Sequence, residues 1–165
     1  MIFSDDDSRW MQIALHEAEA ALEHGDVPVG AVAVWKGDII GRGHNRREAE
    51  QDPTAHAEMI AMRQASQIVQ HWRLEEVTLY CTLEPCCMCA GAMVLARLPR
   101  LVYATHDPKA GAAGSLMDLV RHSQLNHHVH VEHGLYADES AALLRSFFRS
   151  LRDAGQRGRP RPSTT

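Results

Sequence analysis

The sequence predicts an α/β fold in which a five-stranded mixed sheet lies between two layers of helices, a three-layer αβα arrangement. An apolar segment at 31–35, a tight turn and a second strand-like segment at 39–43 predict a β-hairpin. After the hairpin, segments with helical periodicity alternate with short apolar strands. The 165 residues, 45% of them hydrophobic, suffice for one domain with a single core.

Each element is predicted from its periodicity and from the residues at its ends. In chain order we expect a helix capped by Ser8 and ended by Gly25, strands at 31–35 and 39–43, a helix at 55–68, a strand at 77–82, a helix at 85–96, a strand at 101–104, a helical segment at 115–121, a fifth strand at 128–131 and a last helix capped by Asp138.

The domain is expected to cover 8–154. The acidic residues 1–7 should fray, and the Arg- and Pro-containing tail at 155–165 should be disordered. The net charge of −4 does not by itself indicate a nucleic-acid-binding protein, but six arginines lie from Arg145 onward against one acid, Asp153. These arginines are either a solvated helix face with a loose terminus or a surface that attracts a polyanion.

Two further features limit the classes of function that the sequence allows. No apolar run reaches the roughly 18 residues that a membrane span needs, and the first residues do not have the pattern of a secretory signal, so we expect a cytoplasmic protein without a membrane partner. All four cysteines lie between Cys81 and Cys89. Such a cluster favours metal or redox chemistry over a disulfide framework.

Metal-binding chemistry is predicted by His56-Ala57-Glu58 and by Pro85-Cys86-Cys87-Met88-Cys89. Cys86 and Cys89 are three residues apart at the start of a predicted helix, so they share a face where the helix dipole favours thiolates. With the imidazole of His56 they form a nitrogen and sulfur ligand set that suits one zinc ion. Three protein ligands leave a fourth position for water, which zinc makes more acidic.

Glu58 is the candidate proton carrier, two residues beyond His56. A carboxylate beside the activated water can take its proton, deliver it to a ring nitrogen and later protonate the departing amine. His-x-Glu combined with Pro-Cys-x-x-Cys is the signature of the zinc nucleobase deaminases, which predicts hydrolytic deamination.

Other interpretations of these motifs remain open. Cys81, Cys87 or another histidine would be the fourth ligand of a closed structural zinc site, although such a site leaves Glu58 without a role. Cys86 and Cys89 would alternatively form a thioredoxin-type redox pair. The histidines at 127–133 fit a strand with one solvated side better than a second metal site.

From about Trp10 to Leu151 the chain resembles the bacterial tRNA-specific adenosine deaminases, a family of the cytidine deaminase-like superfamily. The segments that carry this resemblance are Val27-Pro28-Val29-Gly30-Ala31-Val32, Asp52-Pro53-Thr54-Ala55-His56-Ala57-Glu58, Thr82-Leu83-Glu84-Pro85-Cys86, Gly111-Ala112-Ala113-Gly114-Ser115-Leu116-Met117 and Phe147-Phe148-Arg149. The last two are more specific to the family than the zinc motif.

The resemblance implies conversion of adenosine to inosine at the wobble position of a tRNA anticodon, with an arginine tRNA as the expected substrate. It implies a homodimer with one zinc ion per subunit and no organic cofactor. His56, Cys86 and Cys89 would be the metal ligands and Glu58 the proton shuttle. A backbone group at Leu83-Glu84 would orient the water or the substrate.

The resemblance also implies substrate contacts. Asn45 matches a base-contacting asparagine, and an amide suits the edge of a flipped base. Asp107 matches an acidic residue near the sugar, where a carboxylate accepts a ribose hydroxyl. Arg46, Arg47 and Lys109 are candidates for phosphate contacts, and Phe148 for stacking on a base. His106, in place of an expected arginine, and Pro108 depart from the family pattern.

Two alternatives belong to other functional classes. A deaminase of free guanine, cytosine or a nucleoside would keep the four site residues but close the pocket around a small substrate. A non-catalytic RNA-binding subunit would keep the zinc site for stability, and such a subunit should lose Glu58 first.

Overall fold

A computed structural model of the chain describes residues 1–155. Five strands form one mixed sheet in the order β2-β1-β3-β4-β5. β1 pairs antiparallel with β2 and with β3, whereas β3–β4 and β4–β5 are parallel pairs. The strands are β1 (Gly30–Trp35), β2 (Asp38–His44), β3 (Val77–Leu83), β4 (Arg100–Thr105) and β5 (His130–His133). The predicted five-stranded mixed sheet is confirmed.

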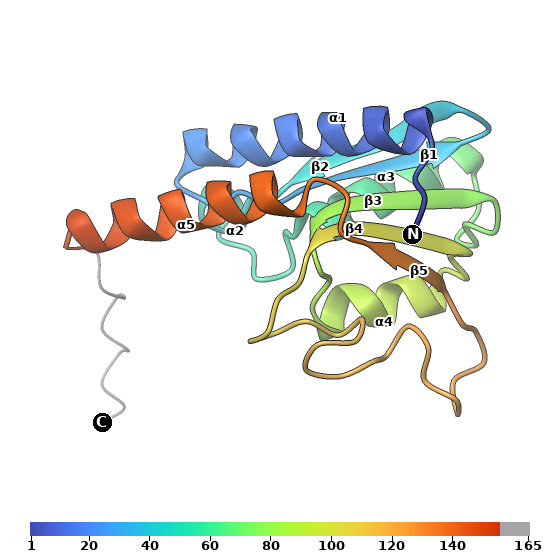
Figure 1. Cartoon of the computed structure of the whole chain (residues 1–165). Coiled ribbons are helices and arrows are strands. Elements are labelled where there is room, and N and C mark those ends of the chain that lie inside the picture. The colour runs from blue at the N-terminus through green and yellow to red at the C-terminus, as the bar shows by residue number, and fades with distance from the viewer. Residues whose placement is uncertain (156–165) are drawn as a thin grey trace, which may run out of the picture.

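The helices cover both sides of this sheet, which confirms the three-layer arrangement (Figure 1). They are α1 (Asp5–Ala21), the 3-10 turn η1 (Leu22–His24), α2 (Arg47–Glu50), α3 (Ala57–Val69), α4 (Cys87–Leu95) and α5 (Ala137–Asp153). α1 and α5 lie on one side, and α3 and α4 on the other (Figure 1). The larger core cluster packs α3 and α4 on the sheet, and a second cluster packs α1 on the opposite face.

Glycines let α3 approach the sheet closely, which positions the residues at its start. A Cβ atom on Gly43 would lie 2.2 Å from the carbonyl oxygen of Ala57, and one on Gly41 would lie 2.2 Å from that of Ala61. Both distances are far below van der Waals contact, so only glycine fits at these β2 positions. The first turn of α3 is therefore held against β2.

The expectation that residues 1–7 fray needs a correction at residues 5–7, which form the first turn of α1. α1 begins at Asp5 rather than after Ser8, because Ser4 and Asp7 form a capping box with hydrogen bonds of 2.9 and 3.0 Å. Asp7 is also buried, and its carboxylate accepts hydrogen bonds from Tyr80 at 2.7 Å and Arg100 at 2.8 Å. Arg100 also pairs with Glu132 at 2.6 Å. The N-terminus is tied to the sheet.

Other element predictions need smaller corrections. Residues 115–121 do not form the expected helix, because the backbone N–H groups of Leu116 and Met117 donate to the carbonyl of Gly111 in a tight turn. The sequence did not predict the short α2. The fifth strand begins at His130, two residues later than predicted, and α5 is preceded by Tyr136, so Asp138 lies in its first turn rather than at its cap.

The tail predicted at 155–165 lies, apart from Gly155, outside the described residues. Within residues 1–155 no helix has the length and apolar character that crossing a membrane requires.

We predict that Asp7→Asn lowers the free energy of unfolding by about 2 kcal/mol at pH 7, because Arg100 and Tyr80 lose a charged partner. Burial alone would raise the pKa of Asp7, but the hydrogen bonds from Arg100, Ser4 and Tyr80 hold it well below its ordinary value. A depressed pKa stabilises the fold above the unfolded pKa of about 3.9, and this stability is lost as the pH falls through the folded pKa.

Urea unfolding from pH 7 to pH 3 measures this effect. The unmodified chain should lose more stability than Asp7→Asn over that range. Asp6→Asn is the matched control, because Asp6 is an exposed carboxylate in the same helical turn. An equal loss in Asp6→Asn and Asp7→Asn would show that the buried network does not stabilise the fold.

Candidate functional site

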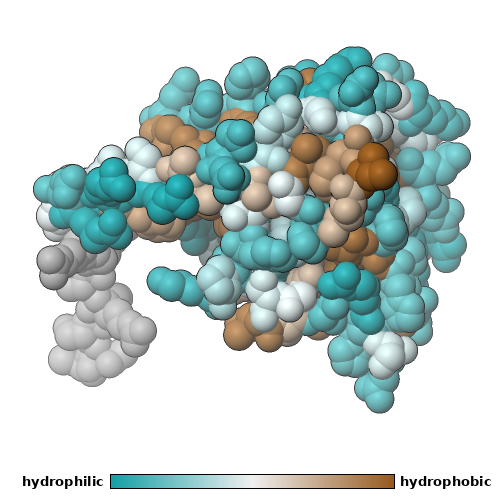
Figure 2. Space-filling model, viewed as in Figure 1, coloured by the Kyte–Doolittle hydropathy of each residue, from teal (hydrophilic) through white to brown (hydrophobic). Residues whose placement is uncertain are grey.

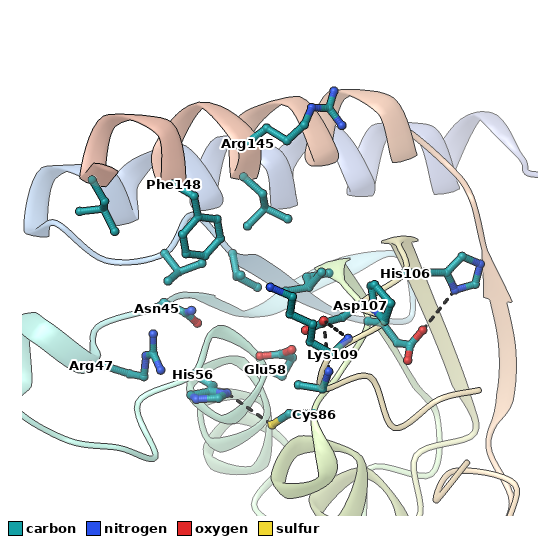
Figure 3. A pocket seen from close by; sticks show the side chains of 18 of the residues that line it. Asn45, Arg47, His56, Glu58, Cys86, His106, Asp107, Lys109, Arg145 and Phe148 are labelled. Carbon is teal, nitrogen blue, oxygen red and sulfur yellow. Dashed lines mark hydrogen bonds and ion pairs between the residues drawn. The ribbon is translucent and has the colours of Figure 1, made fainter. Parts of the chain in front are cut away.

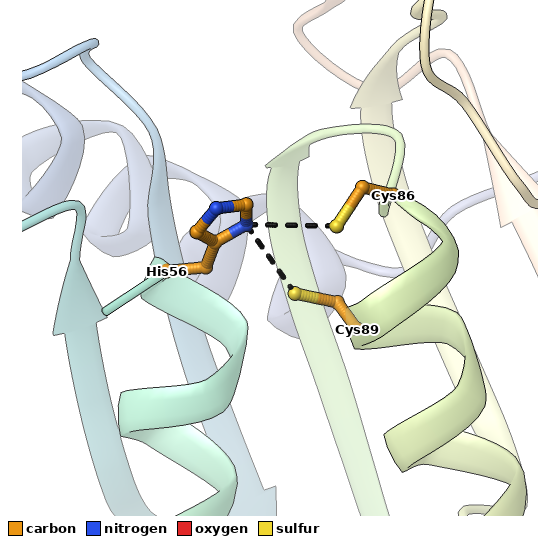
Figure 4. A group of neighbouring side chains, drawn as sticks. All are labelled: His56, Cys86 and Cys89. Carbon is orange, nitrogen blue, oxygen red and sulfur yellow. Dashed lines mark hydrogen bonds between the residues drawn. The ribbon is translucent and has the colours of Figure 1, made fainter. Parts of the chain in front are cut away.

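Three predicted ligands meet where the first turns of α3 and α4 lie side by side (Figure 4). His56 is the N-cap residue of α3, Cys86 is the N-cap residue of α4, and Cys89 lies in the first turn of α4. The Nδ1 atom of His56 lies 3.6 Å from the Sγ atom of Cys86 and 3.6 Å from that of Cys89. This group is positioned to bind a metal ion.

The group has three members within the part of the chain that the structure describes. Its ligand atoms all lie within 4.8 Å of one another, and no further His, Cys, Asp or Glu of residues 1–155 joins it at that distance. Cys81 is buried in the core, Cys87 is exposed, and Cys86 and Cys89 are free thiols rather than a disulfide. This arrangement does not support the closed four-ligand site or the redox pair.

The two thiols differ in their affinity for a proton. A hydrogen bond from Cys89, with a second from His56, lowers the pKa of Cys86 to about 3, although partial burial opposes the shift. The pKa of Cys89 is raised, first because its proton is shared with Cys86 and second because Cys89 is buried. A thiolate at Cys86 also lies at the positive end of the α4 dipole. Cys86 is therefore the thiol that loses its proton more readily.

Glu58 lies beside the ligands, in the first turn of α3. Its side chain is buried, and its Oε2 atom is 3.6 Å from the Sγ atom of Cys89. Burial raises the pKa of Glu58 to about 7, although the neighbouring His56 partly opposes that shift. A carboxyl group that gains or loses its proton near neutral pH suits general acid–base chemistry.

The ligands and Glu58 lie in a pocket of about 850 Å³ (Figure 3). Its wall comes from segments far apart in the chain: the end of β2, the starts of α3 and α4, the loop after β4, and α5. The lining residues are Val27, Val29, Asn45, Arg47, His56, Glu58, Leu83, Glu84, Cys86, His106, Asp107, Pro108, Lys109, Ala110, Leu144, Arg145, Phe148, Arg149, Leu151 and Arg152.

Five of the six predicted substrate contacts line this pocket, namely Asn45, Arg47, Asp107, Lys109 and Phe148. Asn45 is buried, and its Oδ1 atom accepts the backbone N–H of Ala57 at 3.0 Å, which leaves its NH2 group as a donor. Asp107 accepts the backbone N–H of Lys109 at 3.0 Å through Oδ1. Lys109 and Phe148 lie at the rim, and Phe148 is half-exposed.

Arg46 is the predicted contact that does not line the pocket. Its guanidinium pairs with Glu50 at 2.7 Å and lies 3.1 Å from His24, so it is directed away from the ligands. Arg47, the next residue and also a predicted phosphate contact, does line the pocket. The two arginines point in different directions because the chain turns into α2 between them.

The sequence did not assign α5 as a wall of the pocket. Leu144 and Leu151 line it together with Arg145, Arg149 and Arg152. The spacing of these arginines at four and three residues places them on one helix face, which was the signal available in the sequence. Figure 2 shows hydrophilic residues over the end of α5 that projects beyond the sheet. The rim therefore carries five basic side chains, including Arg47 and Lys109, with one carboxylate, Asp107.

The chain is similar to known deaminases over almost its whole length. A MafB19-like deaminase family model matches residues 5–152. The tRNA-specific adenosine deaminase of Bacillus subtilis is 48% identical over 146 residues, which cover 88% of this chain and 91% of that protein.

Solved structures agree with this match. A structure from a study of adenosine-to-inosine editing by tRNA deaminases at the wobble position of transfer RNA is 42% identical, with a TM-score of 0.80, over 83% of this chain and 99% of its own. The guanine deaminase of Nitrosomonas europaea is 22% identical, with a TM-score of 0.73 over 89% of this chain and 86% of its own, and shares the fold alone. By sequence and by structure, this chain belongs to the tRNA-specific adenosine deaminase family.

Proposed function

We propose that this protein hydrolytically deaminates adenosine to inosine at the wobble position of a tRNA anticodon. Water adds its oxygen to C6 of the adenine ring, and the amino group leaves as ammonia. The observation that carries this proposal is the buried Glu58 carboxylate beside the His56, Cys86 and Cys89 group in one pocket. We infer that the enzyme works in the cytoplasm, where its tRNA substrate is found.

We infer that the metal is zinc, one ion per subunit. Tetrahedral zinc with ordinary bond lengths places its nitrogen and sulfur ligands about 3.5 Å apart. The two distances from His56 to the thiols, 3.6 Å each, fit that value. A bound zinc ion would supply a Lewis acid that lowers the pKa of a water molecule. No organic cofactor is part of the proposal.

Glu58 would move the protons of the reaction. Its carboxylate takes one proton from the attacking water and transfers it to N1 of adenine. It then takes the second proton from the hydroxyl group of the tetrahedral intermediate and gives it to the amine, which leaves as ammonia. The buried position of Glu58 keeps bulk water from competing for this proton. This role also disfavours a non-catalytic RNA-binding subunit, for which a buried carboxylate would only lower stability.

Two side chains would orient the nucleotide. The Asn45 amide is held by the backbone of Ala57, so its NH2 group donates to an acceptor on the edge of a flipped base. Asp107 uses Oδ1 for its own loop, and its other oxygen would accept a ribose hydroxyl. Phe148 would stack on a neighbouring base, since its ring is half-exposed at the rim.

The rim favours a tRNA anticodon stem-loop over a free base. Arg47, Lys109, Arg145, Arg149 and Arg152 line a pocket in which a free purine would need none of them. Phosphate groups of an RNA loop would be drawn to these cations. An arginine tRNA is the substrate that the family resemblance suggests.

We also infer a homodimer. Leu95 at the end of α4 is 70% exposed, and Leu116 and Met117 in the loop after β4 are 58% and 43% exposed. Exposed apolar side chains of this size are found at many subunit interfaces. A second copy of the chain would cover them.

The substrate prediction is tested with synthetic anticodon stem-loops, together with free adenosine, guanine and cytosine. Sequencing should read guanosine in place of adenosine only at the first anticodon position of an arginine stem-loop. Because the rim contacts would be ionic, binding should weaken steeply between about 50 and 200 mM salt. Turnover of a free base with no conversion of any stem-loop would contradict the proposal.

Glu58→Gln should lower turnover at least about a hundredfold while the variant keeps its fold and its metal, because only the proton carrier is lost. Single-turnover kinetics, circular dichroism and metal analysis measure these three properties. Glu75→Gln is the control, since Glu75 is an exposed carboxylate outside this pocket. Near-normal turnover in Glu58→Gln would show that another group moves the protons.

Cys86→Ala should lose both zinc and activity, because two ligands and water hold zinc weakly. Cys87→Ala is the matched control: Cys87 adjoins Cys86 but is exposed and outside the ligand group. Metal content per chain, measured by mass spectrometry after dialysis, should be close to one for Cys87→Ala and close to zero for Cys86→Ala. Full zinc occupancy in Cys86→Ala would show that Cys86 is not a zinc ligand.

A further inference from the structure

Glu84 follows the end of β3, and its side chain is completely buried. Glu84 is neither a member of the His56, Cys86 and Cys89 group nor the proposed proton carrier. Its Oε1 atom accepts a hydrogen bond from the Ser115 hydroxyl at 2.5 Å and lies 3.1 Å from Nδ1 of His106. Its Oε2 atom accepts the backbone N–H of Ser115 at 3.3 Å. Both carboxylate oxygens are thus used by one loop.

That loop, residues 106–115, carries part of the pocket rim. Asp107 and Lys109 lie between the two points at which the loop contacts Glu84, namely His106 and Ser115. Asp107 also accepts the N–H groups of Lys109 and Ala110 at 3.0 and 3.2 Å, which closes a tight turn. The position of this turn relative to the sheet therefore depends on what holds its two ends.

Gly111 shows how closely the loop fits around the carboxylate. A Cβ atom at Gly111 would lie 1.7 Å from Oε2 of Glu84 and 2.5 Å from the backbone oxygen of Asp107. Only glycine lets the loop approach Glu84 this closely. The contact is therefore part of the local backbone path rather than a chance meeting of surface side chains.

We propose that Glu84 is a positioning residue that fixes Asp107 and Lys109 at the rim for substrate RNA. The Glu84 clamp, meaning Glu84 with His106, Gly111 and Ser115, holds the loop from its inner side. This inference rests on the proposed function only for the identity of the substrate. The ordering of the loop is a property of the free protein.

Loss of the clamp should affect KM rather than kcat. Asp107 and Lys109 would contact the sugar and phosphate in the bound substrate and in the transition state alike, and the loss of such uniform binding raises KM alone. Ser115→Ala and Glu84→Gln should each raise KM for an anticodon stem-loop about tenfold, with kcat within about twofold and zinc content unchanged.

Unlike Ser115→Ala, Ser115→Thr should have the KM of the unmodified chain. Threonine keeps the hydroxyl, and position 115 is exposed enough for the extra methyl group. Ser4→Ala is the matched control: it removes another hydroxyl with a structural hydrogen bond, because the Ser4 hydroxyl accepts the backbone N–H of Asp7 in the capping box of α1. It should reduce stability and leave KM unchanged. Ser115→Ala with Glu84→Gln in one chain should raise KM less than the product of the two single effects.

Hydrogen exchange of the free protein tests the clamp without RNA. Peptides covering 106–117 should exchange at least about tenfold faster in Ser115→Ala and in Gly111→Ala than in the unmodified chain, whereas peptides of α3 should not change. Unchanged exchange in this loop would overturn the clamp. Faster exchange with unchanged KM would overturn its role in substrate binding.

Two further results separate this inference from the proposed function. A fall in kcat and zinc content in Glu84→Gln, with KM unchanged, would overturn the positioning role and assign Glu84 to support of the metal helix. An unmodified protein that converts no stem-loop would overturn the proposed function and the RNA part of this inference, while the exchange rates would still decide whether the clamp holds the loop.

Discussion

The site depends on the meeting of two helix N-termini on one face of the sheet. His56 precedes α3 and Cys86 precedes α4, so the ligand group exists only while both helices begin at the same edge. The positive ends of two helix dipoles would repel a cation. Thiolates at Cys86 and Cys89 would offset that repulsion in the proposed metal site. Gly41 and Gly43 provide the close approach of α3 on which this geometry depends.

The floor and the rim of the pocket come from different parts of the chain. The floor is built by the first turns of α3 and α4, whereas the rim is built by Asn45 and Arg47, by the loop at 106–110 and by α5. A change at the rim, such as histidine at position 106 in place of the expected arginine, therefore leaves the metal ligands untouched. In this chain His106 has a partner of its own, because its Nδ1 atom lies within hydrogen-bonding distance of Glu84.

The ligand group was predictable from the sequence because it is made of two short motifs. Cys86 and Cys89 share one helical turn, and His56 lies two residues before Glu58. Features that depend on distant contacts were not predictable. Asp7 is ordered by Tyr80 and Arg100, which follow it by 73 and 93 residues. The choice between Arg46 and Arg47 depends on the four-residue helix α2, too short to leave a periodic signal. The packing of α5 beside the pocket is likewise a tertiary property.

The charges of the pocket are arranged by depth, which explains why the overall net charge of −4 was a poor guide to the partner. Glu58 and Glu84 are buried carboxylates, whereas Arg145, Arg149 and Arg152 are exposed at the rim. Exposed cations attract phosphates over about 8 to 10 Å at physiological salt, so they act before the base enters the pocket. Buried carboxylates are screened less by salt, and in the proposed function Glu58 would act on the bound base. In the proposed function, attraction of the substrate and proton transfer would thus depend on separate groups of side chains, one exposed at the rim and one buried at the floor.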